Sequence, residues 1–152
     1  MTFRIHTYGC QMNARDSEAV AALLEQAGHQ PVDDERTADL VLVNSCSVRG
    51  KAEDKAIGKL RLLVKDRRRH PARIVGVMGC MAQRLGPALL DRVRGLDFAV
   101  GTRAAREVPR LVAAAAAGAG PQALLGRPDD PDVPHLHGHG GVSAFVTVLL
   151  GC

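Results

Sequence analysis

The sequence predicts an α/β fold: a parallel sheet with helices on both faces, in the three-layer arrangement of Rossmann and flavodoxin-like domains. Three observations predict it. Short apolar runs alternate along the chain with longer segments of helical periodicity. Each run leads into a turn before the next helical segment, as right-handed crossovers require. The 152 residues are enough for one compact domain, whose core must be aliphatic because the chain has only one Tyr and three Phe.

Four short apolar runs are the expected strands of this sheet. The second contains Leu40 to Val43 without a polar residue, which is typical of a parallel strand buried on both faces. The third and fourth are similarly rich in Val, Ile and Phe. The four strands are expected over residues 3–8, 39–44, 73–78 and 97–100.

The segments between these strands have the spacing of amphipathic helices. Asn13 is the expected N-cap of the first helix, and Gly28 marks its end. A later helix begins at Met81, and Gly86-Pro87 is expected to break and restart it. The uninterrupted helices are expected over residues 14–27, 51–69 and 108–117.

The composition changes after residue 117. Residues 118–141 are rich in Gly, Pro, Asp and His without periodicity, which is typical of a linker. We therefore expect a domain over residues 1–117, a flexible linker over 118–141, and the start of a further domain over 142–152. That last segment reads as one apolar strand without its sheet, which indicates truncation. His135, His137 and His139 alternate with Gly in the linker, and nothing there fixes a metal geometry.

Charge and hydropathy give weaker information about location and partners. A formal charge of +4 and a pI near 9.2 suit an acidic partner such as RNA, but the excess is small. The N-terminus has no apolar signal region, and no run approaches the length of a membrane span. We expect a cytoplasmic monomer that does not contact membranes. Its four cysteines are then expected to be thiols that serve metal or redox chemistry.

Three of the cysteines occupy equivalent places. Cys10, Cys46 and Cys80 each come directly after an expected strand and before an expected helix, about 35 residues apart. Because the carboxyl ends of parallel strands meet at one edge of a sheet, all three should project from that edge. Three thiolates without a further ligand nearby fit a cubane iron–sulfur cluster with one open iron, or a zinc site completed by another ligand. The alternative is that they are small buried side chains that close the strand ends.

The residues around the cysteines form a series of motifs, and the whole series resembles the methylthiotransferase family of radical-SAM enzymes. The resemblance covers the whole chain except the linker. The motifs are Thr-Tyr-Gly-Cys-Gln-Met-Asn at 7–13 with Asp-Ser-Glu at 16–18, Asn-Ser-Cys-Ser-Val-Arg at 44–49 with Lys-Ala-Glu at 51–53, Gly-Cys-Met-Ala-Gln at 79–83, Val-Gly-Thr at 100–102, and Ala-Phe-Val-Thr at 144–147 with Gly-Cys at 151–152.

The resemblance implies a ligand set. Cys10, Cys46 and Cys80 match the cysteines that hold an auxiliary 4Fe–4S cluster in this family. A second 4Fe–4S cluster, on a Cys-x3-Cys-x2-Cys motif of the next domain, cleaves S-adenosyl-L-methionine there. Cys152 matches the first cysteine of that motif, so it would be a ligand only in a longer chain and is here an unpaired terminal thiol. Asn13 and Asn44 either donate hydrogen bonds toward the cluster or serve as cap and turn residues.

The resemblance also implies a reaction. Ser-Val-Arg after Cys46 is similar to the branch that converts N6-isopentenyl-adenosine near the tRNA anticodon to its 2-methylthio derivative, although Ser45 and Gly50 replace that branch's usual Thr and Glu. The implied partners are the tRNA anticodon stem-loop, a sulfur donor and an electron donor. A sister methylthiotransferase for another tRNA adenosine or a ribosomal protein is one alternative, and a non-catalytic module that binds zinc or RNA is another. We expect the 152 residues alone to be inactive.

The densest basic stretch is Lys65-Asp66-Arg67-Arg68-Arg69-His70, with Lys59, Arg61 and Arg73 nearby. A charge run on a long helix is usually its solvated face, and this is our first interpretation. Contact with tRNA phosphates is the other.

Overall fold

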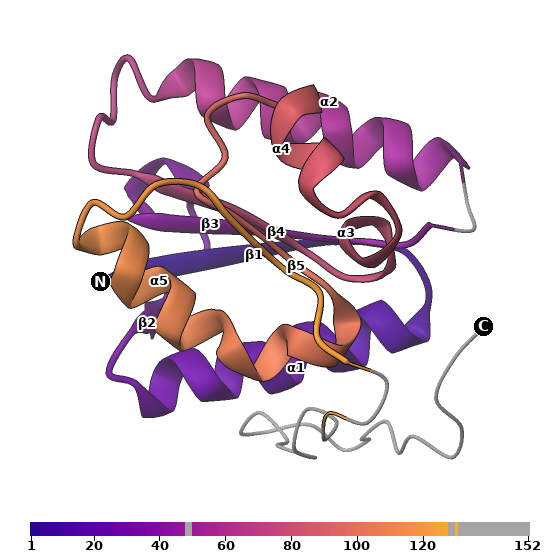
Figure 1. Ribbon diagram of the computed structural model, residues 1–152. Helices are drawn as coiled ribbons and strands as arrows, with labels where there is room; N and C mark the ends of the chain where they lie inside the picture. The colour runs from indigo at the N-terminus through magenta and orange to yellow at the C-terminus, as the bar shows by residue number, and fades with distance from the viewer. Residues whose placement is uncertain (48–49, 128–129, 131–152) are drawn as a thin grey trace.

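A computed structural model describes residues 1–47, 50–127 and 130. These residues form a six-stranded sheet in the order β2-β1-β3-β4-β5-β6, and every neighbouring pair is parallel. Helices α1 and α5 cover one face, and α2, α3 and α4 cover the other (Figure 1). The predicted α/β class with a parallel sheet is thereby confirmed. Cys152, the three histidines at 135, 137 and 139, and the strand expected within 142–150 lie outside the described residues.

The four strands expected from the sequence are present, and two short edge strands add to them. The edge strands carry no apolar run, since β2 is exposed and β6 is half-buried, so hydropathy gives no signal for either. The expectation of irregular linker from residue 118 is therefore wrong for the three residues of β6, which pair with β5. The strands are β1 (Thr2–Tyr8), β2 (Gln30–Pro31), β3 (Leu40–Ser45), β4 (Ile74–Met78), β5 (Phe98–Val100) and β6 (Gln122–Leu124).

The helices follow the expected order, and Gly86-Pro87 separates α3 from α4 as predicted. The N-cap prediction is wrong, because α1 begins earlier and Cys10 is its N-cap instead of Asn13. Within the described residues, no helix has the length and apolar character needed to cross a membrane. The helices are α1 (Gln11–Gln26), α2 (Gly50–Asp66), α3 (Cys80–Leu85), α4 (Pro87–Arg92) and α5 (Val108–Ala116), with short 3-10 helices η1 (Glu35–Thr37) and η2 (Thr102–Glu107).

The strand period of two sends alternate side chains of β3 into two separate cores. Leu40 and Leu42 pack into the core under α1 and α5, and Val41 and Val43 pack into the core under α2, α3 and α4. All four are fully buried. Burial of each such side chain is worth about 1.5–3 kcal/mol. This rigid central strand ends at Ser45, directly before Cys46.

The edge of the sheet where the strands begin is closed by Arg73, which is only 4% exposed. Its guanidinium donates to the carbonyls of Ala38 (3.1 Å), Glu35 (3.2 Å) and Arg36 (3.0 Å). It also donates to the carboxylate of Asp66, the last residue of α2, at 2.8 Å. A buried charge is tolerated only when it is paired and hydrogen-bonded, and this one is. Arg73 thus fixes the far end of α2 relative to β3 and β4.

Candidate metal centre at the carboxyl edge of the sheet

The strand order places a topological switch point between β1 and β3. β2 lies beside β1 on one side, while the later strands follow β3 on the other. Crevices at such points, outside the carboxyl ends of the strands, are where open α/β sheets bind ligands. Cys10 follows β1 and Cys46 follows β3, so these two cysteines flank the switch point. Cys80 follows β4, the next strand along.

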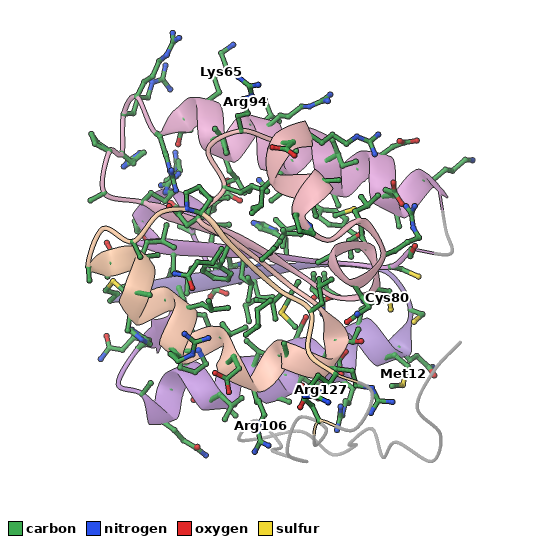
Figure 2. The ribbon with its side chains drawn as sticks, viewed as in Figure 1. Met12, Lys65, Cys80, Arg94, Arg106 and Arg127 are labelled. Carbon is green, nitrogen blue, oxygen red and sulfur yellow. The ribbon has the colours of Figure 1, made fainter. Side chains whose placement is uncertain are left out.

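The backbone brings the Cys10 and Cys46 segments together. Tyr8 and Ser45 are partners at the ends of β1 and β3, and the Cys46 N–H donates to the Tyr8 carbonyl at 2.9 Å. Cys46 is 3% exposed, whereas Cys10 and Cys80 are half-buried. Cys80 and Met12 lie at the same end of the molecule (Figure 2). The predicted shared edge is where the structure places all three cysteines, although no three His, Cys, Asp or Glu side chains among the described residues converge as metal ligands.

A buried hydrogen-bond network joins α1 to β3 behind the cysteines. Asn44 accepts from Asn13 Nδ2 at 2.9 Å, and its own Nδ2 donates to the Asn13 carbonyl at 2.8 Å and to Ser17 Oγ at 2.9 Å. Ser17 Oγ also bonds to Thr7 Oγ1 at 2.8 Å. Both amide groups therefore hold the helix against the strand. Asn13 Oδ1 additionally accepts from the Cys10 N–H at 3.2 Å and lies 3.5 Å from Cys10 Sγ.

Two glycines permit this close packing. A Cβ on Gly9 would lie 2.1 Å from Asn13 Oδ1 and 2.9 Å from the Cβ of Cys46. Gly79 has φ +98, and a Cβ there would lie 2.3 Å from Asn44 Oδ1. Neither position has room for a side chain, and Gly79 also has a backbone conformation that favours glycine. The two glycines therefore let the loops of the cysteines close onto the asparagine pair.

Arg84 on α3 ties the helix of Cys80 to the segment that carries Cys46. Its guanidinium donates to Ser47 Oγ at 2.5 Å and to Glu53 of α2 at 2.5 Å. Sequence reasoning missed Arg84, because an exposed arginine on a short helix has no distinguishing pattern. Thr7 and Ser17 belong to the first motif, but the sequence did not predict the hydrogen bond between their hydroxyls.

A shallow hollow of about 270 Å³ adjoins the cysteine loops. It is lined by Tyr8, Gly9, Lys51, Ala52 and Lys55. The two lysines are exposed on the first turns of α2 and give this rim a positive potential. Such a rim suits anionic groups, whether thiolate ligands or the phosphates of a nucleic acid.

Among the described residues, three cysteine thiols lie at this edge, one after each of β1, β3 and β4. Thiolates favour soft or borderline metals, namely iron in iron–sulfur clusters and zinc, over magnesium or calcium. The thiols present are therefore of the type that iron–sulfur clusters and zinc sites use, although their side chains do not converge on one point in this structure.

Comparison with known proteins gives the family. The model of the family described as "Uncharacterized protein family UPF0004" matches residues 2–101. That range includes Cys10, Cys46 and Cys80. The chain belongs to the UPF0004 family.

This UPF0004 chain is similar to proteins named tRNA-2-methylthio-N(6)-dimethylallyladenosine synthase. It is 43% identical to the protein of Geobacter sulfurreducens over 152 residues, covering 97% of this chain and 34% of the relative. It is 50% identical to that of Opitutus terrae over 108 residues, or 70% of this chain and 22% of the relative. It is 39% identical to that of Moorella thermoacetica, covering 99% of this chain and 35% of the relative. The chain thus spans about a third or less of the length of the curated relatives it matches.

Proposed function

We propose that this UPF0004 chain is the auxiliary-cluster domain of a tRNA methylthiotransferase, with Cys10, Cys46 and Cys80 as ligands of one 4Fe–4S cluster. The observation that carries the proposal is the placement of these three cysteines. Each follows a strand, and the strands β1, β3 and β4 are neighbours in the sheet. The similarity to synthases of 2-methylthio-N6-dimethylallyladenosine supports the choice of reaction.

The chain's own residues have distinct parts in this proposal. The three thiolates bind the cluster, and the pair of Asn13 and Asn44 holds the Cys10 segment against β3 through buried hydrogen bonds. When bound, a cluster with three protein ligands supplies one iron whose fourth position is open to a sulfur ligand. Arg84 positions the Cys46 segment relative to α3.

The remaining parts of the reaction belong to the rest of a longer protein. The proposed substrate is N6-isopentenyl-adenosine in the anticodon stem-loop of tRNA, and the product is its 2-methylthio derivative. S-adenosyl-L-methionine and a second 4Fe–4S cluster, with Cys152 as its first ligand, would act in the next domain. A sulfur donor and an electron donor would be needed, and the cytoplasm, where tRNA is modified, is the proposed location. We expect the enzyme to be monomeric and the 152 residues alone to be inactive.

A chimaera tests this function. The 152 residues replace the matching third of the Geobacter sulfurreducens relative, and the fusion is expressed in a bacterium whose tRNA lacks the 2-methylthio group. The tRNA nucleosides are then analysed by mass spectrometry. We expect 2-methylthio-N6-isopentenyl-adenosine to reappear, because the fusion supplies both cluster domains.

Variants of the chimaera serve as controls. Cys46→Ala is expected to abolish the product, while Glu25→Ala, a change of an exposed residue near the end of α1, retains it. The 152 residues expressed without the remainder should give no product. A soluble, iron-containing chimaera that leaves this nucleoside unmodified would contradict the proposed substrate and favour a sister enzyme for another adenosine or a ribosomal protein.

A further inference from the structure

A concentrated positive charge lies at the opposite end of the molecule from the cysteines. Two elements contribute it: the last turns of α2 and the end of α4 with the residues that follow. Between them is a hollow of about 410 Å³ with Val64 and Val93 in its lining. We call this the basic surface. Its cationic residues are Arg61, Lys65, Arg67, Arg68, Arg92 and Arg94.

Only part of this charge is compensated. Arg67 forms an ion pair with Asp97, and the Arg92 guanidinium lies 3.5 Å from the carboxylate of Glu53. Among the described residues, no carboxylate lines the hollow. The remaining cations of the surface, which are exposed and have no ion pair to a described carboxylate, are Arg61, Lys65, Arg68 and Arg94.

The positive charge continues around α2 to a second hollow of about 500 Å³, where Lys59, Lys65, Arg68 and Arg69 face Glu35 and Asp66. Both of these carboxylates are already engaged. Glu35 bonds to Lys59 at 2.6 Å, and Asp66 bonds to the buried Arg73 at 2.8 Å. The outer side of α2 is therefore cationic on both flanks.

A solvated helix face does not account for this arrangement. Such a face would draw its cations from one helix, whereas here the end of α4 and the segment after it add Arg92 and Arg94 to the cations of α2. Like charges within a Debye length of about 8–10 Å repel one another and destabilise the fold. An anion bound there would compensate the charges that have no ion pair. Arginine-rich surfaces suit phosphate in particular, because the guanidinium group presents two parallel N–H donors to two phosphate oxygens.

The size of the ligand follows from the position of the surface. Helix α2 starts at the cysteine edge and has 17 residues, so its length of about 1.5 Å per residue separates the two ends by about 25 Å. Figure 2 shows Lys65 and Arg94 extending into solvent well away from Cys80. A free phosphate or a nucleotide cannot span that distance. A phosphate backbone of an RNA helix can.

We propose that the basic surface docks the phosphate backbone of an RNA helix, whose far end then reaches the cysteine edge of the sheet. The choice of RNA rests on the proposed function. The assignment of a polyanion rests on the charges and on the hollow. The contacts are sequence-independent, because they are made to phosphates and not to base edges.

The test is binding of a fluorescently labelled RNA hairpin to the iron-free 152-residue chain, measured by anisotropy over a range of salt concentrations. Arg61→Gln combined with Arg94→Gln removes two charges from the surface. Arg106→Gln combined with Arg110→Gln removes two exposed charges from the opposite layer and is the matched control. All four side chains are exposed, so we expect both variants to keep the fold, and circular dichroism of each variant checks this.

Each phosphate contact contributes about 0.7–0.9 to the slope of log affinity against log salt. The first pair of changes should therefore lower the slope by about 1.4–1.8 and weaken binding roughly 20- to 60-fold at 0.1 M salt. The control pair should change the affinity less than about threefold. Equal losses in both variants, or no loss in the first, would overturn the proposal, as would displacement of the RNA by polyglutamate at equal charge concentration. Because the assay needs no cluster, its failure would leave the proposed role of the cysteines unaffected.

Discussion

Replacement of Asn44 by alanine tests whether the asparagine network holds the cysteine edge together. The Asn44 side chain is fully buried and makes three hydrogen bonds, two with Asn13 and one with Ser17. The change removes all three. It also leaves Asn13 Nδ2 buried without the acceptor that it has in the structure, because Asn13 is 1% exposed and water does not reach it.

The magnitude can be worked from these contacts. Each of the three hydrogen bonds contributes about 0.5–1.5 kcal/mol to stability, and an unpaired buried donor costs a further 1–3 kcal/mol, roughly. We therefore expect the free energy of unfolding to fall by about 3–5 kcal/mol, a large part of the roughly 5–15 kcal/mol typical of a domain.

Urea denaturation of the iron-free chain, followed by far-UV circular dichroism, measures this loss. With a slope of about 1–3 kcal/mol per molar urea, the midpoint should fall by about 2 M. Ser47→Ala removes the partly exposed bond to Arg84 and should change the stability by less than about 0.5 kcal/mol. A loss below about 1 kcal/mol for Asn44→Ala would show that the network does not hold the edge, and the reasoning would be refuted.

Three further changes are predicted from single positions. Gly79→Ala should lower the free energy of unfolding by about 2–4 kcal/mol, because φ at this position is +98 and the new Cβ would meet Asn44. Gly58 lies within α2 with open space around it, so Gly58→Ala is the control and should raise the free energy of unfolding by about 0.5–1 kcal/mol in the same urea assay. Arg73→Met should lower the free energy of unfolding by about 3–5 kcal/mol, because four buried or partly buried acceptors lose their donor. A melting temperature within about 2 °C of that of the unchanged chain would contradict this. Burial lowers the pKa of His6 below its ordinary 6.5, so near that pH the folded state binds fewer protons than the unfolded state. The free energy of unfolding therefore falls as the pH drops through 6.5 toward the lowered pKa. His6→Gln should reduce this dependence of stability on pH without abolishing it, because burial also lowers the pKa of His29. If the dependence between about pH 7.5 and pH 5 is unchanged in the variant, His6 is not one of the groups that cause it.

The central strands could be predicted because strands buried on both faces consist almost entirely of apolar residues. The run from Leu40 to Val43 is apolar on both sides and lies between two cores, so a continuous run was the correct signal. The short edge strands β2 and β6 have no such pattern. Their position depends on hydrogen bonds to β1 and β5, which exist only after the sheet has formed.

The start of α1 shows a different limit. Asn13 satisfied the rule for an N-cap, yet it occupies the third helical position and reaches back to the Cys10 N–H, as the second partner of a capping box does. Its amide is also required by Asn44, which is 31 residues away along the chain. Local preference could not reveal that long-range contact. The cysteine edge itself could be predicted, because it needs only the order of strands and turns.

The basic surface could also be predicted only in part. Its presence on α2 was evident from the sequence. The contribution of Arg92 and Arg94 was not, because they come from α4 and from the segment after it, and only the packing of α4 beside α2 brings them into one hollow.

The measurement that most directly tests the account is iron and acid-labile sulfide per chain after anaerobic reconstitution. We predict about four irons and four sulfides in the unchanged chain. Cys10→Ala, Cys46→Ala and Cys80→Ala should each lose most of them while Cys152→Ala keeps them, with circular dichroism confirming the fold of every variant. Zinc in place of iron, or a cluster that survives any one of the three changes, would contradict the claim that these strand-end cysteines act as one site.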